Sequence, residues 1–72
     1  MRIIIVGCGK VGSTITEQLV KEGHDVAVID RDSDVIQDIT NNFDVMGVVG
    51  NGASYSIQKE AGIEDAHLLI AV

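Results

Sequence analysis

Three glycines near the start of the chain have the spacing of a phosphate-binding turn. Gly7, Gly9 and Gly12 follow the pattern G-x-G-x-x-G, directly after a β-branched apolar run from Ile3 to Val6. Such a turn needs glycine for a tight exit from the strand, for room beside a pyrophosphate, and for close packing of the next helix. A helix that begins here presents unpaired N–H groups to an anion. The sequence therefore predicts a cofactor-binding turn that comprises Gly7, Cys8, Gly9, Lys10, Val11 and Gly12.

A carboxylate follows at the distance that such a site needs. Asp30 closes the apolar run from Val26 to Ile29, eighteen residues after Gly12, close to the spacing expected for an acid that accepts hydrogen bonds from ribose hydroxyls. A negative charge there repels a 2′-phosphate, so we expect NAD(H), or ATP and ADP, rather than NADP. Arg31 complicates this choice, because an arginine accommodates that phosphate, stacks on adenine, or is simply solvated.

The spacing from Gly7 to Gly12 also matches the start of the pattern G-x-x-x-x-G-K-[ST]. Ser13 stands where that pattern requires lysine, so P-loop chemistry is excluded.

A second glycine-rich turn, Gly50-Asn51-Gly52, follows the apolar run from Val45 to Val49. In an open α/β sheet this turn lies on the same edge as the phosphate turn, where ligands bind. We expect Asn51 to bind the adenine edge while the glycines allow close approach. The alternative is an ordinary turn in which asparagine and glycine tolerate positive φ.

The remaining chemistry-bearing residues form no catalytic or metal site. Cys8 has no base or second cysteine beside it, so we interpret it as a small residue of the turn rather than a nucleophile. His24 and His67 are isolated from other metal-ligating residues and are interpreted as surface and turn residues. Tyr55 either packs over the nucleotide or covers a helix. We therefore predict neither catalytic residues nor metal ligands.

Composition narrows the class of protein. The chain has 72 residues, of which 46% are hydrophobic and 22% charged, with a net charge of −6. Disorder is excluded by this hydrophobicity, and nucleic acid is disfavoured as a partner by the negative charge. A single cysteine is typical of a reducing, cytoplasmic setting, and no apolar run approaches the ~20 residues that cross a membrane.

Periodicity predicts an α/β fold with a Rossmann-like parallel sheet. Helices are expected from Lys10 or Val11 to Glu22 with Val11, Ile15 and Leu19 facing the sheet, from Asp32 or Ser33 to Asn42, and from about Ser54 to Ala61. Strands are expected over 3–6, 26–29, 45–49 and 66–72, with Gly23 and Gly62 ending helices. Three right-handed crossovers give the strand order 3-2-1-4.

The fourth predicted strand, 66–72, has the composition of a buried strand, yet that order places it at an edge. Natural proteins normally cover an exposed apolar edge. We therefore expect the 72 residues to be part of a longer nucleotide-binding domain, truncated relative to a full Rossmann domain, or else to pair through this edge.

The motifs together resemble one family. The segments Ile4 to Gly12, Val28 to Arg31, Val48 to Ala53 and Ala61 to Val72 are similar to the N-terminal nucleotide-binding domain of Trk-type potassium-uptake regulators, called TrkA-N, RCK_N or KTN. The resemblance covers the whole chain. It implies that the three glycines hold the pyrophosphate, Asp30 the ribose, and Arg31 the adenosine, with Gly50, Asn51 and Gly52 lining the adenine side.

The resemblance also implies a role and partners. Members of this family are cytoplasmic regulatory domains, not enzymes. They bind NAD(H) or adenine nucleotides, assemble into dimers and rings, and gate a membrane potassium-transporter subunit of the TrkH type. We expect the chain to be such a domain at the inner face of the cell membrane, without inserting into it. Two alternatives remain open: the N-terminal half of an NAD-dependent oxidoreductase, and a fragment that binds nothing.

Overall fold

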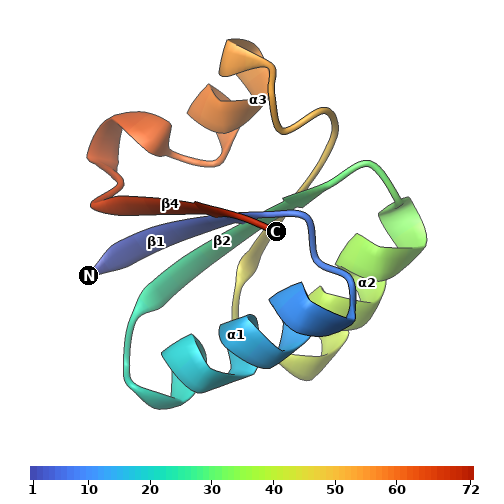
Figure 1. The fold of residues 1–72 in the computed structure, drawn as a ribbon, viewed down its shortest axis with the longest axis vertical. Coiled ribbons are helices and arrows are strands. Elements are labelled where there is room, and N and C mark those ends of the chain that lie inside the picture. The colour runs from blue at the N-terminus through green and yellow to red at the C-terminus, as the bar shows by residue number, and fades with distance from the viewer.

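The chain folds into one four-stranded parallel sheet with helices on both faces (Figure 1). The computed structural model describes all 72 residues. In chain order its elements are β1 (Arg2–Val6), α1 (Lys10–Lys21), β2 (Asp25–Asp30), α2 (Ser33–Asn42), β3 (Met46–Val49), α3 (Tyr55–Glu60), the short 3-10 turn η1 (Ile63–Asp65) and β4 (Leu68–Ala71). The strand order is β3-β2-β1-β4, which confirms the predicted Rossmann-like topology.

The central strand β1 separates two small cores. Ile3 and Ile5 point to one face, where they pack with residues of β2, α1 and α2. Ile4 points to the other face, where α3 is the only α-helix. All three isoleucines are almost completely buried, as expected for a strand with a helix-covered layer on each side.

The side of helix α1 that lies closest to the sheet carries a glycine and a threonine, not its apolar residues. Gly12 and Thr16 are its buried residues, and Ile15 and Leu19 pack beside them. The prediction that Val11 faces the sheet is wrong, because its side chain is 64% exposed. The inward stripe begins one residue later, at Gly12, since only a residue without a side chain fits where the helix approaches the strand.

The helix ends are as predicted. Gly23 and Gly62 adopt left-handed conformations, with φ of 84° and 89°, after α1 and α3. Asp32 is the N-cap of α2, where its side chain accepts a hydrogen bond from the backbone N–H of Asp34 at 2.9 Å.

Strand β4 differs most from its prediction. The strand covers 68–71 instead of 66–72, and the unpredicted turn η1 precedes it at residues 63–65. It lies at an edge, as expected, but it is not buried: Leu68 and Leu69 are 46% and 38% exposed. Composition alone describes a strand suited to burial, whereas the position at the edge leaves one side of β4 without a neighbour. Strand β3 starts at Met46, one residue later than predicted.

None of the three helices is long and apolar enough to cross a membrane.

Candidate functional site

The glycine turn between β1 and α1 has the geometry that its sequence predicts. Gly7 adopts φ of +87°, and its backbone N–H donates to the carbonyl of Ile29 at 2.8 Å. A Cβ atom on Gly12 would collide with the carbonyl oxygen of Gly7. Glycine at position 7 therefore makes the turn, and glycine at position 12 brings α1 against the strand.

Gly9 is open to solvent. A Cβ atom at this position would meet nothing within 4 Å, so the space above the backbone is free. Gly9 is also the N-cap of α1, and no side chain caps the helix there. The first N–H groups of α1 consequently have no acceptor within the helix and face outward, an arrangement suited to an anion.

Asp30 lies between the glycine turn and the start of α2. Its Oδ2 accepts a hydrogen bond from the backbone N–H of Cys8 at 2.8 Å, and its Oδ1 accepts one from the N–H of Asp32 at 2.9 Å. Hydrogen bonds from Asp32 and then Cys8 lower the pKa of the Asp30 carboxyl below its ordinary value. The site therefore keeps a negative charge at neutral pH.

A cavity of about 380 Å³ opens above the carboxyl ends of the strands, at the edge predicted for a ligand. It brings together six of the predicted site residues: Gly7, Asp30, Arg31, Gly50, Asn51 and Gly52. Val6, Ile29 and Ala53 complete its lining. None of these three is among the predicted site residues: Val6 and Ile29 end the apolar runs before Gly7 and Asp30, and Ala53 directly follows the Gly50-Asn51-Gly52 turn. We call this space the rim cavity.

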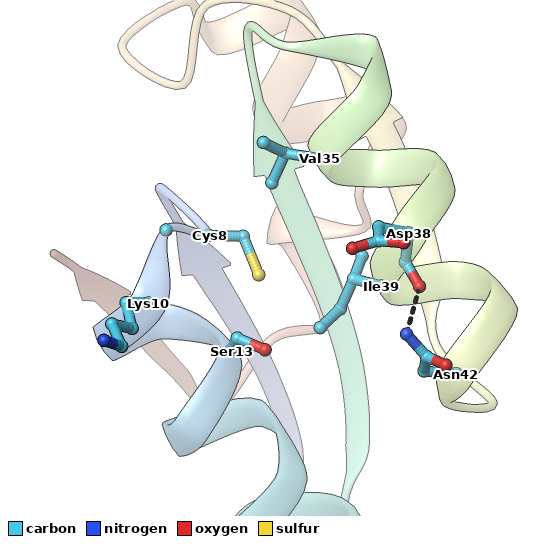
Figure 2. Close-up of a pocket in the computed structure, with 8 residues that line it drawn as sticks. Cys8, Lys10, Ser13, Val35, Asp38, Ile39 and Asn42 are labelled. Atoms are coloured by element: carbon cyan, nitrogen blue, oxygen red, sulfur yellow. Dashed lines mark hydrogen bonds between the residues drawn. The ribbon is translucent and has the colours of Figure 1, made fainter.

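Other residues of the glycine turn border a different space. Cys8, Gly9, Lys10 and Ser13 line a cavity of about 290 Å³ between α1 and α2. Figure 2 shows the side chains of Cys8 and Ser13 directed toward α2, while the Lys10 side chain points away. The two remaining predicted site residues line neither cavity, because Val11 is exposed and Gly12 is buried against Gly7. The backbone of Cys8, bonded to Asp30, connects the two spaces.

The Gly50-Asn51-Gly52 turn does not need glycine for positive φ, because none of its residues has one. The ordinary-turn alternative is therefore wrong about positive φ. A Cβ on Gly50 would lie 2.7 Å from Cδ1 of Ile57, and one on Gly52 would collide with the Val6 side chain. Close packing therefore selects both glycines.

Two polar side chains shape this turn. The Oδ1 of Asn51 accepts a hydrogen bond from the N–H of Ala53 at 3.0 Å, and Gln58 donates through Nε2 to the carbonyl of Gly52 at 2.7 Å. Gln58 was not identified from the sequence. It lies six residues from its partner on another element, a relation that no local motif encodes.

The Cys8 thiol is a poor nucleophile in this setting. Its side chain is buried, and burial raises the pKa of the thiol above its ordinary value; the Asp30 charge also raises it, whereas a hydrogen bond with Thr16 lowers it. Thr16 also donates to the carbonyl of Gly12 at 2.8 Å. Sequence reasoning missed Thr16 because an apolar-periodicity search passes over a buried threonine.

The other residues considered from sequence lie away from the rim cavity. The Tyr55 ring is 62% exposed, and its hydroxyl donates to Glu64 at 3.3 Å. His24 lies in the turn before β2 beside Glu22. His67 accepts a hydrogen bond through Nδ1 from the N–H of Arg2 at 3.0 Å, which extends the β1–β4 pairing by one contact. No group of three or more His, Cys, Asp or Glu side chains is arranged to hold a metal ion.

Comparison with known proteins gives one consistent result. Residues 3–72 match the TrkA-N domain family. Over all 72 residues the chain is 42% identical to the Trk system potassium uptake protein TrkA of Halomonas elongata and 43% identical to the protein of that name from Streptomyces coelicolor. The chain spans only 16% and 32% of the length of these two relatives.

Solved structures agree with the sequence relatives. The TrkA-N domain of the inner membrane protein ybaL from Escherichia coli matches with a TM-score of 0.89 and 30% identity, over 97% of this chain and 51% of that one. The Kef CTD of Shewanella denitrificans, in an AMP-bound form, matches with a TM-score of 0.82 and 25% identity, over 96% of this chain and 40% of that one.

Proposed function

The chain belongs to the TrkA-N domain family, and from that premise we propose that it is a nucleotide-sensing module of a potassium-uptake regulator. The 72 residues correspond to the part of such a domain that carries the glycine turn. In this role the module binds its ligand and changes the activity of a membrane potassium-transporter subunit of the TrkH type. It catalyses no reaction.

The observation that carries the proposal is the rim cavity with its charge pattern. Gly7 of the glycine turn lies on one side of it, and the turn continues to the uncapped start of α1, which borders the adjacent cavity and suits a phosphate group. On the other side lies the Asp30 carboxylate, which suits ribose hydroxyls. A volume of about 380 Å³ falls within the roughly 300–1,000 Å³ of small-molecule sites. The AMP-bound Kef neighbour supports an adenine nucleotide as the ligand.

Each residue of the site then has a role. The N–H group of Gly9 and those of the first turn of α1 bind phosphate oxygens, because the N–H groups of Gly7 and Cys8 already donate to Ile29 and Asp30. Gly9 also allows the phosphate to approach closely. Arg31 contacts the adenosine, and the free Nδ2 group of Asn51 donates to the adenine edge. Because Asp30 remains ionised, a 2′-phosphate is repelled. The ligand is NAD(H), ATP or ADP rather than NADP.

The relatives favour a regulator over the N-terminal half of an oxidoreductase, because they carry the names of potassium uptake proteins. We place the module in the cytoplasm at the inner face of the membrane, where its transporter partner lies, and we expect it to act as a dimer or larger homo-oligomer.

Isothermal titration of the chain with AMP, ADP, ATP, NAD, NADH and NADPH tests the proposal. We expect saturable binding of at least one adenine nucleotide, with NADPH weakest. Gly9→Ala adds a methyl group where the phosphate approaches and should weaken binding by at least about tenfold, since phosphate contacts of this kind tolerate no side chain. Gln37→Ala, an exposed change on α2, is the matched control and should bind normally.

Two results would contradict the proposal. One is a folded chain that binds none of the six ligands, and the other is normal binding by Gly9→Ala. The proposed regulation of transport is tested separately, by measuring potassium uptake in cells that express the protein with Gly9→Ala. Uptake that responds normally to the nucleotide, despite lost binding, would contradict regulation through this site.

A further inference from the structure

Asp30 joins two parts of the chain that both border the ligand site. Its Oδ2 accepts from the N–H of Cys8, twenty-two positions earlier in the sequence, while its Oδ1 accepts from the N–H of Asp32. One side chain thus fixes the glycine turn to the end of β2 and to the start of α2.

The bond to Cys8 is one of two consecutive anchors of the turn. The N–H of Gly7 donates to the carbonyl of Ile29, and the N–H of Cys8 donates to the Asp30 carboxylate, both at 2.8 Å. On the other side of the backbone, the Cys8 side chain is buried toward α2. Without the carboxylate, the N–H of Cys8 has only water as an acceptor, and α1 begins two residues later.

A carboxylate can make these bonds and still bind a ligand. Its two oxygens offer about four acceptor positions, and the backbone bonds use two of them. The bonds also fix the orientation of the side chain, so that the remaining positions can accept from ribose hydroxyls in the rim cavity. Hydrogen bonds to a charged acceptor are among the stronger ones in proteins.

We propose that Asp30 is a positioning residue for the phosphate-binding turn, in addition to being a contact for the ribose. This inference rests on the proposed nucleotide site. It means that removal of the carboxylate weakens binding of a nucleotide that has no ribose hydroxyls to contact. Charge repulsion alone predicts the opposite change in affinity, because loss of a negative charge near a diphosphate should tighten binding.

A cycle of two ligands and two proteins separates these effects. ADP and 2′,3′-dideoxy-ADP are titrated into the unaltered chain and into Asp30→Ala. If Asp30 positions the turn, Asp30→Ala weakens binding of dideoxy-ADP by at least about fivefold, the order expected for loss of one charge-assisted hydrogen bond. Asp25→Ala removes the same charge from the opposite end of β2 and should not weaken either ligand. Equal or tighter binding of dideoxy-ADP by Asp30→Ala overturns the inference.

Amide hydrogen exchange in the ligand-free chain gives an independent readout. The Cys8 amide should be protected in the unaltered chain and should exchange about tenfold faster or more in Asp30→Ala. Asp30→Asn retains one acceptor oxygen and should give an intermediate rate. Asp30→Asn also replaces Asp30→Ala in this measurement if Asp30→Ala does not fold.

The two hypotheses fail in different ways. If the unaltered chain binds no nucleotide, the proposed function fails, whatever the exchange rates are. If the chain binds ADP but the exchange of the Cys8 amide is the same in all three proteins, the positioning role of Asp30 fails and the proposed function stands.

Discussion

At the scale of single residues, Thr16 tunes the Cys8 thiol. The polar Thr16 hydroxyl lowers the pKa of a thiol that burial raises. We predict that Thr16→Val shifts the pKa of Cys8 to a still higher value, measured as the midpoint of the iodoacetamide labelling rate against pH. The matched control is Thr14→Val, because Thr14 makes the same kind of bond to a carbonyl four residues earlier but lies on the exposed side of α1. A midpoint in Thr16→Val at or below that of the unaltered chain would refute the prediction.

Asp30 should give the stability of the chain a pH dependence of known sign. Bonds from Asp32 and Cys8 hold its pKa below the ordinary value of 3.8. A depressed pKa means that the stabilisation is complete above the unfolded-state pKa and is lost as the pH falls through the folded-state pKa. The contribution of Asp30 to the stability should therefore change with pH only under acidic conditions.

The measurement is urea unfolding of the chain and of Asp30→Asn from neutral pH to about pH 2. At neutral pH the variant should be less stable by about 1–3 kcal/mol, the cost of weakening two hydrogen bonds to a charged acceptor. The difference should narrow as the pH falls below 3.8. A difference that stays constant down to about pH 2 would show that the carboxylate charge contributes nothing.

At the scale of elements, two glycines of one motif should lose very different amounts of stability on the same change. Gly12→Ala places a methyl group against the carbonyl of Gly7 and should destabilise the chain by about 1–3 kcal/mol, despite the better helix propensity of alanine. Gly9→Ala meets no neighbour and has a φ of −70° that alanine adopts freely. Its cost should stay below about 1 kcal/mol, the difference between the two residues as N-caps. Equal losses in urea unfolding would contradict the assigned packing of α1.

Local sequence rules predicted the parts of the site that depend on neighbouring residues. The glycine spacing, the acid at the end of β2 and the glycines that end α1 and α3 are all encoded within a few positions, and the structure has them where they were expected. What was missed depends on contacts between elements. Val11 was placed inward because its apolar side chain fits the period, but the close approach of α1 to the sheet favours Gly12 and Thr16. The bond from Cys8 to Asp30 spans twenty-two positions, and no motif reports it.

At the scale of the whole molecule, the exposed face of β4 should govern self-association. Leu68 and Leu69 are 46% and 38% exposed, and β4 has a hydrogen-bonded neighbour on one side only. Unpaired strand edges with apolar side chains associate with other chains, and lysine on such an edge opposes this. We predict that Leu68→Lys reduces the associated fraction in sedimentation velocity at high protein concentration.

Val11→Lys is the control for that prediction. It introduces the same charge at an apolar residue that is 64% exposed, but on a helix, whose backbone groups are paired internally. Association reduced equally by both variants would point to net charge, not the strand edge, as the cause.

The central place of β1 has a consequence for the time at which the site forms during synthesis. One neighbour of β1 is β2, which a ribosome makes soon afterwards, but the other is β4, and the contact between Arg2 and His67 spans 65 positions. Until β4 has been made, the apolar strand β1 has one open edge, a state prone to aggregation in nascent proteins. Val72 donates its N–H to Val6, directly before the glycine turn. The glycine turn, although made early, therefore gains its packing against Val72 only after β4 has docked.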